Sequence, residues 1–227
     1  MPKFFAPADE PVDWKELLAK PDLHWKTGYS ARSLAYSWTE ASGFPIEVQA
    51  VLDESESECL HDLEFLIGVP EHEVPLPGGR RPSQTDVFVL AAGSDGLVSI
   101  AVEGKVSEPF DVSVNERFAT PTPGQSTRLE FLLELLELDR QAVGEIGYQL
   151  LHRTASGVLE ARRFGARHAV MLVHSFSQEL EHFSDFEAFV GLYGQSVSAN
   201  QLVEAKRLGD VTVYLGWAVG NAEYLTR

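Results

Sequence analysis

Two extended segments joined by a tight turn constrain the fold of this chain more than any other feature. Residues 86–92 and 97–106 are rich in valine, alanine and other strand-forming residues, and Gly93-Ser94-Asp95-Gly96 separates them. A glycine-containing connection of this length between two such segments is typical of a β-hairpin. Side chains alternate between the two faces of a strand. In the second segment this places Val98, Ile100 and Val102 on one face, and Ser99, Ala101, Glu103 and Lys105 on the other.

The residues around this hairpin predict helices and further strands. Apolar spacing predicts helices over residues 30–42, 60–67, 128–138, 145–164 and 183–193. Residues 45–52 fit a helix or a strand, with helix slightly favoured, and residues 73–76 fit a short extended piece. Residues 168–176 are a continuous apolar run of the kind found in buried strands, and residues 210–219 alternate like a last strand. With no internal repeat or low-complexity linker, we expect one α/β domain over residues 1–227.

Composition excludes several classes of protein. Cys59 is the only cysteine, so neither an intramolecular disulfide nor a cysteine-based zinc site can form, which fits a reducing compartment. No stretch approaches the roughly 20 apolar residues of a membrane span, and residues 1–11 lack the pattern of a signal peptide. We therefore expect a cytoplasmic protein with no membrane partner.

The chain is strongly acidic, with a formal net charge of −16. This argues against a protein that coats nucleic acid non-specifically, because such binding needs clustered lysine and arginine. It does not exclude a nuclease, since charge can be segregated: acidic residues crowd positions 53–58 and 130–139, and basic ones gather at Arg80-Arg81 and between positions 153 and 167. The alternative for both groups is an ordinary solvated surface.

One group of charged residues has a spacing that suggests chemistry. Glu103 and Lys105 lie two residues apart on one strand, so both side chains leave from the same face. Asp86 begins the partner strand and can reach Glu103 at the same end of the sheet. Two converging carboxylates repel each other unless a cation lies between them, and Mg²⁺ prefers oxygen ligands and keeps several waters, with Mn²⁺ as a substitute. A nearby lysine can position or deprotonate the attacking water and stabilise a charged transition state.

These residues and their order resemble the PD-(D/E)xK superfamily of nucleases, which includes type II restriction endonucleases. The stretch from Ser83 to Asp86 and the stretch from Val102 to Phe110 are also similar to an uncharacterised bacterial family with this core. Thr85 stands where the superfamily name places a proline. The resemblance implies a restriction-endonuclease-like α-β-β-β-α-β core over residues 29–176, with a central mixed sheet flanked by helices. Residues 1–28 would be a helical extension, and residues 177–227 a C-terminal elaboration.

The resemblance also implies roles for individual residues. Asp86, Glu103 and the carbonyl of Gly104 would ligate Mg²⁺, and Lys105 would serve the water. The superfamily often places polar residues, commonly a glutamine, on the helix after this strand, and Gln149 fits that catalytic position. His152 and Arg153, on the same stripe of the long helix, would contact the phosphate or a water. We expect Arg153 or Arg80 to hold the phosphate. The alternative for the stripe is the wet face of an amphipathic helix. Ser30, Glu40 and Glu47 could add a ligand, although structural roles are expected for them.

The sequence therefore predicts a magnesium-dependent nuclease that hydrolyses phosphodiesters, in DNA rather than RNA, with a homodimer as a further expectation. Three alternatives remain open at this stage. Lys105 could form an ordinary cross-strand salt bridge with Asp86 or Glu103 on a solvated sheet face. The fold could be kept as a binding or regulatory module without catalysis. Lastly, the acidity could make the protein a nucleic-acid mimic that occupies the basic groove of another protein.

Overall fold

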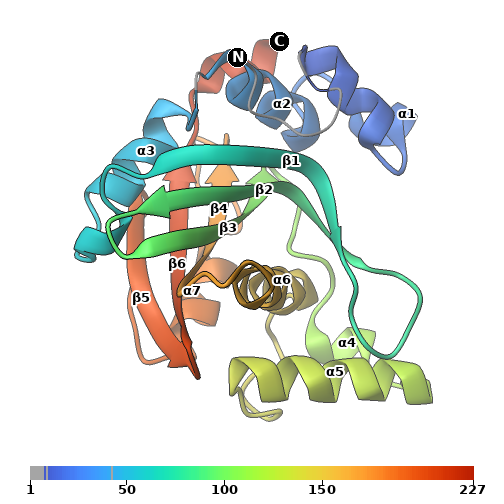
Figure 1. The fold of residues 1–227 in the computed structure, drawn as a ribbon. Helices are drawn as coiled ribbons and strands as arrows, with labels where there is room; N and C mark the ends of the chain where they lie inside the picture. The colour runs from blue at the N-terminus through green and yellow to red at the C-terminus, as the bar shows by residue number, and fades with distance from the viewer. Residues whose placement is uncertain (1–7, 9, 42) are drawn as a thin grey trace.

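A six-stranded mixed sheet forms the centre of the protein (Figure 1). The structure is a computed structural model and describes residue 8 and residues 10–41 and 43–227. In spatial order the strands are β1 (Glu64–Val74), β2 (Ser83–Gly93), β3 (Gly96–Lys105), β4 (His168–Ser175), β6 (Val211–Val219) and β5 (Gln201–Leu208). The pairs β1–β2, β2–β3 and β5–β6 are antiparallel, whereas β3–β4 and β4–β6 are parallel. The predicted α/β class with a mixed central sheet is confirmed.

Helices cover both faces of this sheet. One face carries the segments η1 (Pro11–Leu17), α1 (Pro21–His24), α2 (Ser30–Glu40), α3 (Ile46–Asp53), η2 (Glu58–Leu60) and η3 (Ala222–Thr226). The other face carries α4 (Val114–Arg117), α5 (Pro123–Leu136), α6 (Tyr148–Phe164) and α7 (Phe183–Gly191). Figure 1 shows α6 end-on beneath the sheet, with α5 on the far side of α6. Among the described residues no helix combines the length and the apolar character needed to cross a bilayer.

Each face of the sheet has its own apolar core. Val98, Ile100 and Val102 of β3 pack with Leu34 and Trp38 of α2 in the first core. The second core lies between the sheet and α5, α6 and α7. β4 runs through the middle, and every one of its residues is buried. This burial explains why its sequence is a continuous apolar run, because a parallel central strand is covered on both faces.

The prediction of a helix over residues 60–67 is wrong. The chain forms the short 3-10 turn η2 and then enters β1 at Glu64. Within this segment Leu63 and Phe65 are buried, whereas Leu66 is 38% exposed, which is the alternation of a strand. A short apolar run fits either periodicity, and pairing with β2 decides the outcome here. For residues 45–52 the favoured choice is confirmed, since they form most of α3.

The C-terminal residues extend the same sheet. β6 pairs directly with β4, and β5 adds an edge strand that the sequence did not predict. β5 alternates between buried and exposed positions, and Glu204, Lys206 and Arg207 interrupt its apolar residues. Such an edge strand has one wet face and no apolar run to identify it. Of the expected N-terminal extension, residues 1–7 and 9 lie outside the described part of the chain.

Candidate active site

Glu103 and Lys105 lie at the end of β3, with their side chains on the face that α6 covers. The Nζ atom of Lys105 is 3.1 Å from Oε1 of Glu103. Lys105 is only 4% exposed and Glu103 only 2%. The predicted same-face arrangement is thus present, and the pair does not lie on a solvated sheet face. Burying such a pair costs desolvation energy, which further hydrogen bonds must offset.

Side chains from the first two turns of α6 supply those hydrogen bonds. Nε2 of Gln149 donates to Oε1 of Glu103 over 2.6 Å, and Nζ of Lys105 donates to Oε1 of Gln149 over 2.8 Å. Nε of Arg153 donates to Oε2 of Glu103. The helix stripe predicted to carry Gln149 and Arg153 therefore faces the sheet. Its interpretation as a wet helix face is wrong, because Arg153, Ser156 and Glu160 are 7%, 1% and 3% exposed.

His152 lies beside this network and is held by Ser83 at the start of β2. Oγ of Ser83 is 2.8 Å from Nδ1 of His152 and accepts a 3.1 Å hydrogen bond from Arg153. Burial, followed by the positive charge of Arg153, holds the pKa of His152 well below its usual 6.5. His152 is therefore neutral at physiological pH and can offer a polar contact but no charge to a phosphate.

Asp86 reaches the site from β2 and bonds to the backbone of β3. The ladder between the two strands extends to the pair Val87–Val102. Beyond that pair, Oδ2 of Asp86 accepts a 2.8 Å hydrogen bond from the amide of Gly104. Burial and then repulsion from Glu103 raise the pKa of Asp86 to about 7, although Arg153 and Lys105 oppose this. The carboxyl group of Asp86 is thus held in place by a backbone amide and is partly protonated at neutral pH.

Glu71 on β1 joins the site and was missed by the sequence analysis. It stands between the pairs Pro70–Val87 and His72–Thr85, which places it opposite Asp86. Its backbone has a φ of +51°, a left-handed conformation that is uncommon for a non-glycine residue in a strand. Burial and then repulsion from Asp86 raise its pKa to about 9. Because residues 60–67 were read as helix, no predicted strand extended to Glu71.

The three carboxyl groups differ in their neighbours and hence in their charge. Burial favours the protonated form of Glu103 as well, but Arg153 and Lys105 outweigh it and hold its pKa below the usual value. Glu71 has a single hydrogen-bond donor in the side chain of Gln84, at 2.8 Å. At neutral pH Glu71 therefore keeps its proton, Asp86 is partly protonated, and Glu103 is ionised beside Lys105 and Arg153.

These groups line a cavity of about 420 Å³. Most of the predicted site residues lie on its wall, namely Asp86, Glu103, Gly104, Lys105, Gln149, His152 and Arg153. The remaining wall comes from Leu18, Ala19, His24, Ser30, Ala31, Glu71, Gln84, Glu108, Pro109 and Asp111. Arg80 is not among the lining residues; it is exposed in the connection between β1 and β2.

The three residues considered as an additional ligand separate into two groups. Ser30 lines the cavity, but its amide and hydroxyl both donate to Oε1 of Glu108, at 3.1 and 2.7 Å. Glu40 and Glu47 line a different cavity, beside η3. Glu47 accepts from Nε2 of His174, whose Nδ1 accepts from the indole of Trp38. His174 is thus a buried core histidine held by two side-chain hydrogen bonds.

The donor set limits how a metal ion could bind. In the described part of the chain no group of three or more histidine, cysteine, aspartate or glutamate side chains is arranged to hold a metal. Two carboxylates and water are nevertheless enough for Mg²⁺, which usually keeps several waters. A cation beside Asp86 would favour the ionised forms of Asp86 and Glu71 and replace the protons that these acids keep. Glu103 accepts two hydrogen bonds at Oε1 and one at Oε2, so Oε2 keeps a lone pair that could ligate a metal.

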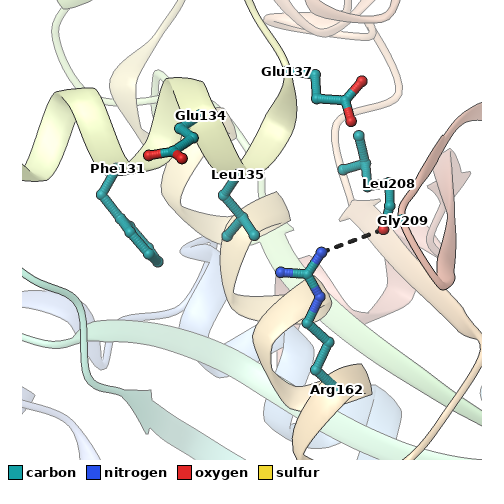
Figure 2. Close-up of a pocket in the computed structure, with 7 residues that line it drawn as sticks. All are labelled: Phe131, Glu134, Leu135, Glu137, Arg162, Leu208 and Gly209. Carbon is teal, nitrogen blue, oxygen red and sulfur yellow. Dashed lines mark hydrogen bonds between the residues drawn. The ribbon is translucent and has the colours of Figure 1, made fainter.

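A second cavity, of about 370 Å³, offers no comparable chemistry (Figure 2). It lies between α5, α6 and the turn after β5, and its lining residues are Phe131, Glu134, Leu135, Glu137, Arg162, Leu208 and Gly209. Arg162, a cation among its described lining residues, donates to the carbonyl of Leu208 over 3.3 Å, as the dashed line in Figure 2 shows. The carboxylates of Glu134 and Glu137 lie apart from Arg162 in this view.

The fold and the site together define a mixed α/β protein with a buried acid–lysine–arginine cluster where the hairpin of β2 and β3 meets the start of α6. Comparison with protein families identifies the chain further. It belongs to the family described as domain of unknown function DUF6946, whose model matches residues 7–222. Comparisons with curated proteins and with solved structures gave no match.

Proposed function

We propose that this protein is a metal-dependent phosphodiesterase that hydrolyses nucleic acid, with DNA as its expected substrate. The observation that carries the proposal is the convergence of Asp86, Glu103 and Lys105 in one cavity. An isolated salt bridge between Glu103 and Lys105 would need neither Asp86 nor the glutamine that hydrogen-bonds to both members of the pair. The resemblance of these residues to the PD-(D/E)xK superfamily points to the same chemistry.

The residues of the cavity would have different roles in this reaction. Asp86 and Glu103, with the carbonyl of Gly104, would hold Mg²⁺, which when bound supplies positive charge to the phosphate and lowers the pKa of a water. Lys105 donates to Glu103 and Gln149 and lies 4.9 Å from the ring centroid of Phe110, and its ammonium group has a third hydrogen that could turn to a water or a phosphate oxygen. Arg153 is fixed by Glu103 and Ser83 and brings a second positive charge to the cavity wall.

The reaction is a hydrolysis without a covalent enzyme intermediate. The water oxygen forms a new bond to phosphorus, and the bond from phosphorus to the leaving sugar oxygen breaks. Of the two water protons, one ends on the leaving oxygen and the other on the phosphate product or in solvent. Lys105 stabilises the negative charge that accumulates on the phosphoryl oxygens, and Gln149 keeps the ammonium group in place.

Substitution of the two central residues tests this proposal. Lys105→Ala and Asp86→Ala should each lower magnesium-dependent cleavage at least about 100-fold, because a positioned donor or ligand in a transition state is worth that much. Lys206→Ala is a matched control. This lysine of β5 forms a half-exposed ion pair with Glu137 and does not line the cavity. Circular dichroism should show all three variants folded.

The same experiment addresses the alternative of a non-catalytic module. If purified wild type and both site variants release product at the same rate, the cluster has no catalytic role. The cluster would then be a structural network inside a binding or regulatory protein. If only the two site variants lose activity while Lys206→Ala keeps it, the hydrolytic assignment stands.

A further inference from the structure

The reactive groups of the cavity are recessed rather than presented on an open surface. Glu103 is 2% exposed and Lys105 is 4% exposed. The cavity volume of about 420 Å³ falls in the range of small-ligand pockets, roughly 300–1,000 Å³. A phosphate that reaches Lys105 must therefore enter a recess below the protein surface.

Segments from several parts of the chain close the cavity around these groups. Leu18 and Ala19 follow η1, and His24 ends α1, so this N-terminal segment forms part of the wall beyond the sheet. Ala31 of α2 and Pro109 of the segment after β3 also line the cavity, which is partly open to solvent. A double helix is a broad convex cylinder that carries its phosphates along its outer surface. To reach Lys105, one of its phosphates would have to pass below the rim that these segments form.

The charge of the wall also disfavours a long duplex. Glu108 and Asp111 line the cavity together with Asp86 and Glu103, and the whole chain carries a formal net charge of −16. Duplex DNA has one negative charge per roughly 1.7 Å of its axis, so laying it over such a surface would be strongly unfavourable. An unpaired strand has fewer charges per length and can bend one nucleotide inward.

We infer that the cavity admits an unpaired nucleic-acid strand and excludes intact duplex. This inference rests on the proposed function and narrows its substrate class. Ala19 is an exposed residue of the N-terminal wall, so a large side chain at this position would narrow the entrance without touching the reactive groups. Ala142 is an equally exposed alanine in the turn before α6 and does not line the cavity, which makes it the matched control.

The test uses three substrates with the full-length protein and Mg²⁺: a linear single strand, a blunt duplex of the same sequence, and bis(4-nitrophenyl) phosphate. We expect the single strand to be cleaved at least 100-fold faster than the duplex. Ala19→Trp should raise KM for the single strand several-fold, and by a larger factor than it raises KM for the small diester. Ala142→Trp should change neither value.

The outcomes separate this inference from the proposed function. Cleavage of the duplex as fast as of the single strand, lost in Lys105→Ala, would overturn the inference and leave the phosphodiesterase assignment in place. An equal effect of Ala19→Trp and Ala142→Trp would also contradict an entrance at Ala19. If none of the three substrates is cleaved, including the small diester that needs no wide entrance, the proposed function fails and the inference fails with it.

Discussion

At the scale of single residues, the site is defined by which carboxyl groups have partners. Glu103 accepts from three side-chain donors and has a lowered pKa. Asp86 accepts one backbone amide, Glu71 accepts one side-chain amide, and both have raised pKa values. Carboxyl groups in a cavity whose pKa values are raised by burial and by neighbouring acids are a common feature of functional sites. The protein thus keeps two acids in an unfavourable environment beside a well-paired one.

The raised pKa of Glu71 predicts a pH dependence of stability. Its pKa in the folded protein is about 9, against a usual value of 4.5, so the folded state keeps a proton that the unfolded chain releases between these values. Stability should therefore fall as pH rises through this window, by up to about 1.4 kcal/mol per pH unit for this group. Glu71→Gln should flatten the slope. Chemical denaturation without divalent ions at pH 5 and pH 8 measures it, and equal slopes for variant and wild type would refute the assignment.

Gln149 predicts an effect on turnover rather than on substrate binding. It accepts from Lys105 and donates to Glu103, so it holds both groups in one position. Gln149→Ala should lower kcat by about 10- to 100-fold, as expected for a lost hydrogen bond to a charged group, with a smaller change in KM. Steady-state kinetics on the small diester gives both values. A rise in KM alone would indicate that Gln149 contacts substrate and does not position Lys105.

At the scale of elements, the site depends on how α6 starts against the segment after β3. Gly147 immediately precedes the helix, and a Cβ atom there would come within 2.5 Å of the carbonyl oxygen of Phe110. The amides of Tyr148 and Gln149 donate to the carbonyls of Val112 and Phe110. This close contact fixes the position of the first turns of α6, and hence the place where Gln149 and Arg153 contact Glu103 on β3.

Gly147→Ala should therefore shift the start of α6, lower stability by about 1–3 kcal/mol and reduce activity together with it. Gly191→Ala, at the end of α7, is the matched control, because nothing lies within 4 Å of a Cβ atom there. Thermal unfolding and activity assays of both variants provide the measurement. If Gly147→Ala keeps full stability and activity, the backbone contact with Phe110 does not position the helix.

The elements that the sequence predicted and those that it missed differ in their physical signals. The hairpin, α6 and β4 have strong periodicity and were predicted, because their patterns match their burial. β5 is a polar edge strand, and the start of β1 has a short apolar run of ambiguous period. For the site, the strand repeat of two residues was enough to place Glu103 and Lys105 together. Glu71 could not be found this way, because its position depends on pairing between β1 and β2.

At the scale of the whole molecule, the layers on both sides of the sheet contribute to one cavity. β2, β3 and α6 provide the reactive groups, and the N-terminal segment from η1 to α2 provides part of the wall. The sequence treated residues 1–28 as an extension of the core. Leu18, Ala19 and His24 in fact line the same cavity as Lys105. The N-terminal layer therefore belongs to the site as well as to the fold.

Binding of a divalent ion should stabilise the entire fold. An ion at about 100 times its dissociation constant adds about 2.7 kcal/mol, which corresponds to several degrees in Tm for a chain of this size. We expect Mg²⁺ to raise Tm of the wild type and of Lys206→Ala, but not of Asp86→Ala. Differential scanning calorimetry with Mg²⁺ or with chelator gives the comparison. The same increase in Asp86→Ala would place the ion elsewhere.

The most direct test of the central claim is the location of a bound metal ion in a crystal soaked with Mn²⁺, a substitute for Mg²⁺ whose position can be recorded by anomalous diffraction. Our account predicts an anomalous peak between the carboxylates of Asp86 and Glu103, within about 2.2 Å of one oxygen of each. A saturated soak without a peak at this position would contradict it.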